Sequence, residues 1–150
     1  MSTTNIRIPE AQYRLIEFRQ RDLPGFASVN TALEGFEPKL AFSWHLSLLI
    51  KCVDLIDNRL PSPKEQNTLY EFEDGLNQLI KANDNALFLA RITHDACREL
   101  IWRVRDPEIA DLIIQKILRT GDYPREFDYR MEEDQQWQKA SWYLNNATAS

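Results

Sequence analysis

The stretch KLAFSWHLSLLIK, residues 39–51, decides the fold, because apolar side chains alternate with small, polar or charged ones along its length. A period of two residues is typical of a β-strand with one buried face. The apolar set in this register is Leu40, Phe42, Trp44, Leu46, Leu48 and Ile50. We therefore predict one long strand over residues 39–51 and build the rest of the fold around it.

Shorter strands are predicted on both sides of this stretch. Residues 13–20 and 26–33 flank the segment RDLPG, whose Pro24-Gly25 pair suits a turn, so they predict an antiparallel hairpin. After the long strand, the same kind of pattern predicts strands at 86–92, 98–105 and 125–131.

Three stretches predict helices. Ser62, Pro63 and Glu65 form a capping box ahead of apolar residues at helical spacing, which predicts a helix over 63–82. Asp106-Pro107 begins a second helix in the same way, and Gly121 ends it. A short terminal helix is predicted over 132–144, with Trp137, Ala140 and Leu144 on one side.

From residue 39 onward the predicted order is strand, helix, strand, strand, helix, strand, which is the split βαβ order of ferredoxin-like folds. We predict an α+β fold in which an antiparallel sheet carries two helices on one face, with an N-terminal β-hairpin and a short C-terminal helix added. The 150 residues are expected to form a single domain, with flexible ends at about 1–10 and 145–150.

Composition and charge exclude several classes of function. The formal net charge is −5, and the arginines are scattered beside acidic residues, so no nucleic-acid surface is predicted. The polar N-terminus lacks the apolar stretch of a secretory signal, and no apolar run is long enough to span a bilayer. Together with only two cysteines, Cys52 and Cys97, these features predict a cytoplasmic protein with no membrane partner.

Reactive side chains gather in RITHDACRE, residues 91–99. His94, Asp95 and Cys97 lie between two predicted strands, so 93–97 is interpreted as a hairpin loop or its shoulder. Zinc needs about four ligands, and the only other histidine and cysteine are His45 and Cys52, so no metal site is predicted. A dyad of Cys97 with His45 stays open.

Tryptophans and carboxylates are interpreted as mainly structural. Trp44 and Trp102 are in phase with apolar strand neighbours and are predicted core residues. Trp137 and Trp142 are five residues apart and cannot share a helix face, so one of them is a candidate partner contact, and we select Trp137. The acidic clusters are expected on solvated helix faces, and with no glycine-rich phosphate loop we predict no cofactor.

Three segments carry a family resemblance: LPSPKEQNTLYEFEDGL (60–76), ALFLARITHDACREL (86–100) and REFDYRMEEDQQWQ (125–138). Over about residues 13–144 the chain resembles the bacterial domain-of-unknown-function family numbered 695. The resemblance implies an α+β domain and no assigned activity. The matching residues Arg91, Thr93, Arg98 and Glu99 are either a ligand or partner site, or a salt-bridged hairpin.

Two positions depart from the family pattern. Ala90 and Ala96 stand where the resemblance leads us to expect glycine, before the arginine and in the hairpin turn. Because a turn that needs positive φ disfavours alanine, we expect a longer or differently shaped hairpin here.

The first functional hypothesis is a non-enzymatic protein-binding or regulatory domain, for example an inhibitor or immunity-type protein that masks a basic partner. An alternative is an enzyme that acts on an anionic small molecule through Cys97, a nearby histidine (His45 or His94) and Arg91 with Arg98. A further alternative is an acidic regulator of an RNA-processing enzyme, supported by the acidic run at 132–134.

Overall fold

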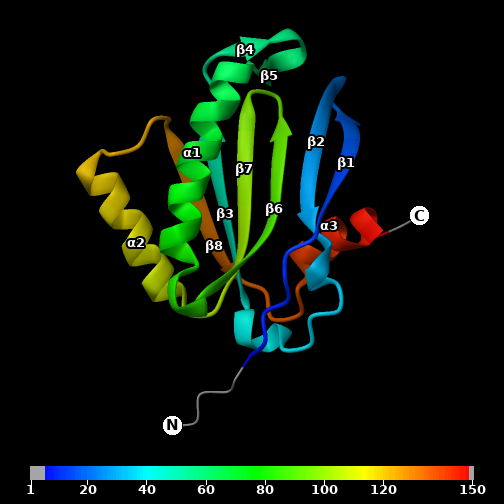
Figure 1. Ribbon diagram of the computed structural model, residues 1–150, viewed down its shortest axis with the longest axis vertical. Helices are drawn as coiled ribbons and strands as arrows, with labels where there is room; N and C mark the ends of the chain where they lie inside the picture. The colour runs from blue at the N-terminus through cyan, green and yellow to red at the C-terminus, as the bar shows by residue number, and fades with distance from the viewer. Residues whose placement is uncertain (1–5, 149–150) are drawn as a thin grey trace.

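The chain folds around one six-stranded sheet in the order β1-β2-β6-β7-β3-β8, and every neighbouring pair is antiparallel (Figure 1). This computed structural model describes residues 6–148. The sheet strands are β1 Tyr13–Gln20, β2 Leu23–Asn30, β3 Trp44–Lys51, β6 Ala86–His94, β7 Cys97–Val104 and β8 Phe127–Glu133. The short strands β4 Leu55–Ile56 and β5 Leu60–Pro61 pair separately. The helices are α1 Pro63–Ile80, α2 Pro107–Thr120 and α3 Gln138–Thr148.

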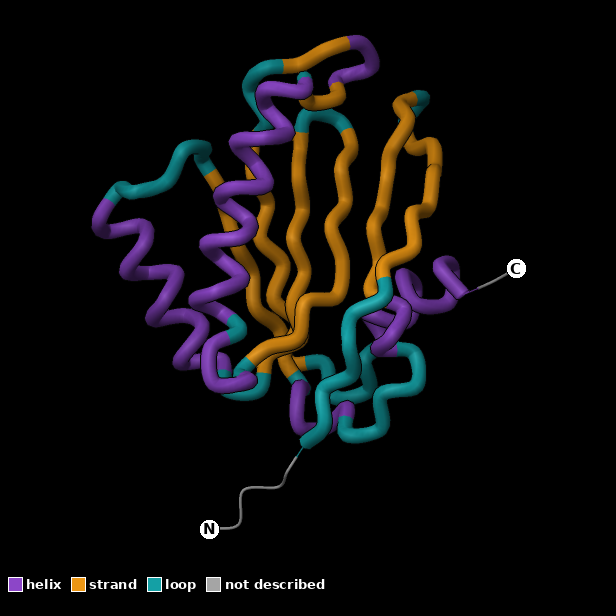
Figure 2. The backbone as a smooth tube through the Cα atoms, in the orientation of Figure 1, coloured by secondary structure: helices purple, strands orange, loops and turns teal. Residues whose placement is uncertain are grey.

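Helices cover both faces of the sheet, and each face has its own core (Figures 1 and 2). On one face, α1 and α2 bury a first core that includes Leu48, Leu76, Trp102 and Ile114. On the other face, α3 and the segment before β3 bury a second core that includes Val29, Phe42, Ile101, Trp137 and Leu144. The α+β class and the two helices on one face are confirmed. Within residues 6–148 no helix is long and apolar enough to cross a membrane.

The long strand starts later than its pattern predicted. Strand β3 begins at Trp44, and Lys39–Phe42 forms a 3-10 helix instead. Phe42 is buried in the second core, whereas Leu46 and Leu48 face the first core, so one alternating run serves two faces. Periodicity alone therefore overestimated the strand.

The first hairpin also turns at a different place. The turn lies at Arg21 and Asp22, which both have positive φ (53° and 61°), and Pro24 and Gly25 belong to β2. Pro24 has no N–H group to donate, and it lies before Gly25, where the pairing of β2 with β6 begins. The proline thus interrupts no bond between the two inner strands.

The caps of α1 and α2 follow the sequence with one exception. The Ser62 hydroxyl accepts from the Glu65 N–H at 3.1 Å, and Gly121 ends α2 with φ +68°. Glu65 does not return to the Ser62 N–H, which already donates to the Asp54 carbonyl. The buried Glu65 carboxylate instead accepts from Arg125 and from the Val53 N–H, so the expected capping box is only half formed.

The C-terminal helix is shifted relative to the prediction. Residues 132 and 133 belong to β8, and α3 runs over Gln138–Thr148 with Ala147 fully buried. At the other end, Ile6 and Ile8 pack against the second core. Parts of the two chain ends predicted to be flexible therefore pack against the second core, and residues 1–5 and 149–150 lie outside the described part of the chain.

Strand β6 carries a β-bulge. Phe88 pairs with Trp102, but Ala90 pairs with Ile101, so β6 has one extra residue between these pairs. Phe88 packs in the first core, and Leu89 and Ala90 both pack in the second. Beyond the bulge, the odd-numbered residues of β6 face α1 instead of the even-numbered ones. Arg91 and Thr93 therefore lie on the α1 side of the sheet.

The hairpin between β6 and β7 is short. Its turn consists of Asp95 and Ala96, both with positive φ (49° and 61°), so of the two expected alternatives, a longer or a differently shaped hairpin, the longer one is wrong. Neighbouring groups hold this strained turn: the Ala96 N–H donates to the Arg59 carbonyl, and the Ala96 carbonyl accepts from the Cys52 N–H. The Asp95 carboxylate also pairs with the Arg59 guanidinium.

We expect the Ala96→Gly substitution to raise the free energy of unfolding by about 1 kcal/mol, because glycine removes the Cβ that positive φ disfavours. Urea denaturation followed by circular dichroism measures this change. Ala90→Gly, on β6 of the same hairpin and without positive φ, is the matched control and should be destabilising. A lower midpoint for the Ala96→Gly variant would contradict the argument.

Candidate functional site

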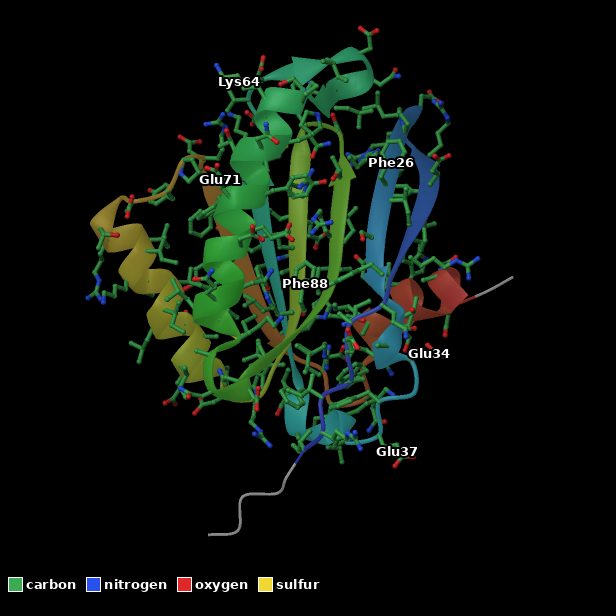
Figure 3. The ribbon with its side chains drawn as sticks, in the orientation of Figure 1. Phe26, Glu34, Glu37, Lys64, Glu71 and Phe88 are labelled. Atoms are coloured by element: carbon green, nitrogen blue, oxygen red, sulfur yellow. The ribbon has the colours of Figure 1, made fainter. Side chains whose placement is uncertain are left out.

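A cavity of about 330 Å³ lies on the α1 side of the sheet, near the tip of the β6–β7 hairpin. Strands β6 and β7 provide Arg91, Thr93 and Arg98, so three of the four residues singled out by the family resemblance meet here. Phe26 reaches the cavity from β2 (Figure 3). The remaining lining residues are Leu15, Ser28, Ile56, Leu60, Pro61, Gln66 and Tyr70.

Arg98 is the unusual residue of this cavity. Its side chain is only 1% exposed, and its Nη2 donates to Gln66 Oε1 at 2.5 Å. Its Nε and Nη1 atoms are buried and have no hydrogen-bond acceptor among residues 6–148. Burial lowers the pKa of Arg98, because removal from water disfavours the charged guanidinium.

Arg91 is neutralised, in contrast to Arg98. It forms two hydrogen bonds with the Glu73 carboxylate on α1, one of them between Nε and Oε1 at 2.7 Å. This pairing raises the pKa of Arg91. The Tyr70 ring lies against both guanidinium groups, 5.0 Å from that of Arg91 and 5.2 Å from that of Arg98. Arg91 thus has an ion-pair partner, whereas the Arg98 guanidinium has none among residues 6–148.

Helix α1 contributes Gln66 and Tyr70, which sequence reasoning did not single out. They lie four residues apart and hence on one helix face. A polar residue and an aromatic residue at this spacing were a usable signal, but only once the orientation of α1 over the sheet was known.

Glu99, the fourth residue of the resemblance, points to the opposite face of the sheet. Its carboxylate accepts from the Ser47 hydroxyl at 2.5 Å. The alternative of a salt-bridged hairpin fits poorly, because none of the ion pairs within residues 6–148 joins β6 to β7. Arg91 instead pairs with α1.

Cys97 also lies on the opposite face, away from Arg91 and Arg98. It lines a second hollow with His94, Glu99 and other residues. Burial raises the pKa of the Cys97 thiol, and the neighbouring Glu99 adds to this effect, so the thiol form is favoured. In the described part of the chain, no group of three or more histidine, cysteine or carboxylate residues could hold a metal ion.

His45 belongs to a buried network rather than to a dyad with Cys97. Arg103 Nη1 donates to His45 Nδ1 at 3.2 Å and to Asp134 Oδ2 at 3.0 Å. Burial, together with Arg103, lowers the pKa of His45 from 6.5 to about 4. The Arg103 guanidinium also lies over the Trp137 ring at 4.6 Å. These contacts attach the start of α3 to the sheet.

Trp137 is not available for a partner contact, although we selected it as a candidate. It is 1% exposed, stacks on Phe36, and its Nε1 donates to the Lys39 carbonyl at 2.9 Å. The exposed member of the pair is Trp142, at 53%. Of the two predicted core tryptophans, Trp102 is fully buried and Trp44 is half-buried.

We expect Cys97 to react several-fold more slowly with iodoacetamide at pH 7 than free cysteine does, because its raised pKa disfavours the thiolate. The Cys52→Ala variant isolates the Cys97 signal, which mass spectrometry quantifies over time. The same variant unfolded in guanidinium is the control and should react at the rate of free cysteine. Faster reaction in the folded state would restore the nucleophile hypothesis.

The lowered pKa of His45 predicts that the free energy of unfolding depends on pH. The unfolded state takes up a proton near pH 6.5 but the folded state only near pH 4, so stability is complete above pH 6.5 and falls between these values. From pH 7.5 to pH 5 this residue should cost about 2 kcal/mol. In the His45→Gln variant, which keeps an acceptor for Arg103, denaturation curves should lack this component; an identical pH dependence in both proteins would refute it.

The comparisons with known proteins agree with the resemblance found in the sequence. A family model described as "Family of unknown function (DUF695)" matches residues 19–145, which is most of the chain. Neither the curated proteins nor the solved structures gave a match. The matched segment contains the cavity residues Arg91, Thr93 and Arg98. The chain thus belongs to the family of unknown function DUF695.

Proposed function

We propose that this protein is a non-catalytic binding domain whose ligand presents an anionic group to Arg98. The observation that carries the proposal is the buried Arg98 guanidinium, which lines a cavity while its Nε and Nη1 lack acceptors within residues 6–148. Buried polar groups in folded proteins nearly always have a hydrogen-bond partner, so a buried group without one indicates that a ligand, ion or water supplies it. A bound anion supplies both the acceptors and the counterion.

The chemistry of arginine supports an oxyanion as the ligand group. A guanidinium is permanently charged and pairs in plane with carboxylate and phosphate oxygens. Gln66 fixes the guanidinium through Nη2, and the hydroxyl groups of Ser28 and Thr93 also line the cavity. These groups can donate further hydrogen bonds to an anion.

Binding is favoured over catalysis by what lines the cavity. The lining within the described residues contains no histidine, cysteine or carboxylate that could act as nucleophile or base. The thiol of the enzyme hypothesis, Cys97, is on the other face of the sheet with a raised pKa. Among the described lining residues, a ligand held at Arg98 therefore meets hydrogen-bond donors but neither an imidazole, a thiol nor a carboxylate.

We also propose that β3 to β8 form a ferredoxin-like split βαβ unit. The strand order β8-β3-β7-β6 supports this assignment, with α1 and α2 in the two crossover connections. A cytoplasmic location stays a proposal too, supported by the free thiols of Cys52 and Cys97.

A second candidate function is regulation through a protein partner, of the inhibitor or immunity type or toward an RNA-processing enzyme. The specific observation in its favour is the exposed Trp142, which borders a hollow lined by two acidic residues, Glu99 and Glu132, and two basic ones, Arg130 and Lys139. The preference for a basic partner rests on the formal net charge of −5 of the whole chain.

The Arg98→Met substitution tests the main proposal. Calorimetric titration with acetate and with inorganic phosphate should give wild-type dissociation constants on the order of 1 mM, as expected for ligands of a few atoms. The variant should bind at least about tenfold more weakly, since the charge-assisted hydrogen bonds are lost. Its melting temperature should be unchanged or higher, because the substitution removes an unpaired buried charge.

Arg14→Met, the same substitution on β1 with an exposed arginine, is the matched control and should bind anions like the wild type. Equal binding by the Arg98→Met variant, or no binding of either anion by the wild type at tens of millimolar, would overturn the proposal.

A further inference from the structure

We infer that the ligand of the Arg98 cavity is a small amphipathic organic acid, with a carboxylate or phosphate monoester head beside Arg98 and an apolar body at the cavity mouth. This inference rests on the function proposed above and adds the chemical class of the ligand. It follows from the distribution of polar and apolar groups in the cavity and from its size.

The inner part of the cavity is polar and buried. Arg98 is 1% exposed and Thr93 7%, and Gln66 holds the guanidinium in place from α1. Arg91 is already occupied by Glu73, so the attraction for an anion is concentrated at Arg98. The negatively charged head group of the ligand therefore lies in the inner part of the cavity, beside Arg98.

The mouth of the cavity is apolar and exposed. Leu15 is 63% exposed, Ile56 55% and Tyr70 41%, and all three line the same cavity. They come from three separate elements, β1, β4 and α1. Large apolar side chains that gather at a cavity and stay exposed are typical of a ligand site, because a ligand removes them from water.

Apolar side chains also connect the mouth with the interior. Phe26, Leu60 and Pro61 line the wall, so a hydrocarbon or ring attached to the head group meets apolar surface along its path. Each buried methylene group then contributes to affinity through removal of apolar area from water. A purely inorganic anion leaves this surface exposed.

The volume of about 330 Å³ points to a small molecule. Cavities that bind small ligands begin at roughly this volume. Of a protein partner, only one side chain or chain end would fit inside. We therefore assign the cavity to a free organic acid and treat an acidic peptide as an outcome of the test.

A chain-length series tests the inference on the full chain. Calorimetric titration would compare acetate, butyrate and hexanoate, then the corresponding alkyl phosphates, with hexylamine as the cationic control. Affinity should rise about fourfold per added methylene until the cavity is filled. Hexylamine should not bind, because Arg98 repels it. The better of the two series identifies the head group.

Two surface variants separate the mouth from the head site. The double variant Leu15→Thr with Ile56→Thr should weaken hexanoate about tenfold, since apolar contact area is lost, and leave acetate within about twofold. Leu40→Thr, at an exposed leucine outside the cavity, is the matched control and should change neither.

The outcomes distinguish the two proposals. If acetate and phosphate bind through Arg98 but affinity does not rise with chain length, the inference is overturned and the proposed function stands. If no anion binds, both fall. Equal binding of hexylamine and hexanoate would indicate unspecific apolar contact and overturn the inference. Tighter binding of a short acidic peptide than of every alkyl acid would overturn it in favour of a protein ligand.

Discussion

The extra residue in β6 is the constraint on which the candidate site depends. Before the bulge, Phe88 faces α1; after it, Arg91 and Thr93 do, and both lie beside Arg98 on the neighbouring strand. In a regular strand the parity of Phe88 would send Arg91 and Thr93 to the α3 face instead. The bulge thus lets one strand fill the core with apolar residues at one end and present polar residues to a cavity at the other.

Buried charges in this protein follow one rule with one exception. Glu65, Glu73 and Arg103 are almost inaccessible, and each pairs with a partner on a different element, namely Arg125, Arg91 and Asp134. These pairs join α1 to β6 and to the segment before β8, and β7 to the start of α3. Breaking any of them would leave an uncompensated charge inside the fold. Among the buried arginine and glutamate residues of the described part of the chain, Arg98 alone has no ion-pair partner.

Local signals in the sequence predicted the helices and strands well, but they predicted less well where the turns lie and which face of the sheet each side chain occupies. The caps at Ser62, Asp106 and Gly121 depend on neighbouring residues, so the boundaries of α1 and α2 followed from the sequence, whereas those of α3 did not. The β6–β7 turn did not, because the contacts that hold Ala96 at positive φ come from distant residues. Arg91, Thr93 and Arg98 were identified as candidates, but their separation from Glu99 and Cys97 depends on strand faces and on the bulge. Trp142 was overlooked because burial of Trp137 is decided by Phe36 and Arg103, which lie far away in the chain.

The position of β3 in the chain has a consequence for folding during synthesis on the ribosome. Both strands that pair with β3 follow it in the chain, β7 after α1 and β8 after α2. While the chain emerges from the ribosome, β3 has two open edges and one apolar face, which includes Leu46, Leu48 and Ile50. Strands β1 and β2, in contrast, can already pair with each other. The sheet closes only when the C-terminal third has been made. The period of greatest exposure to aggregation and to chaperones therefore falls during synthesis, before the finished sheet exists.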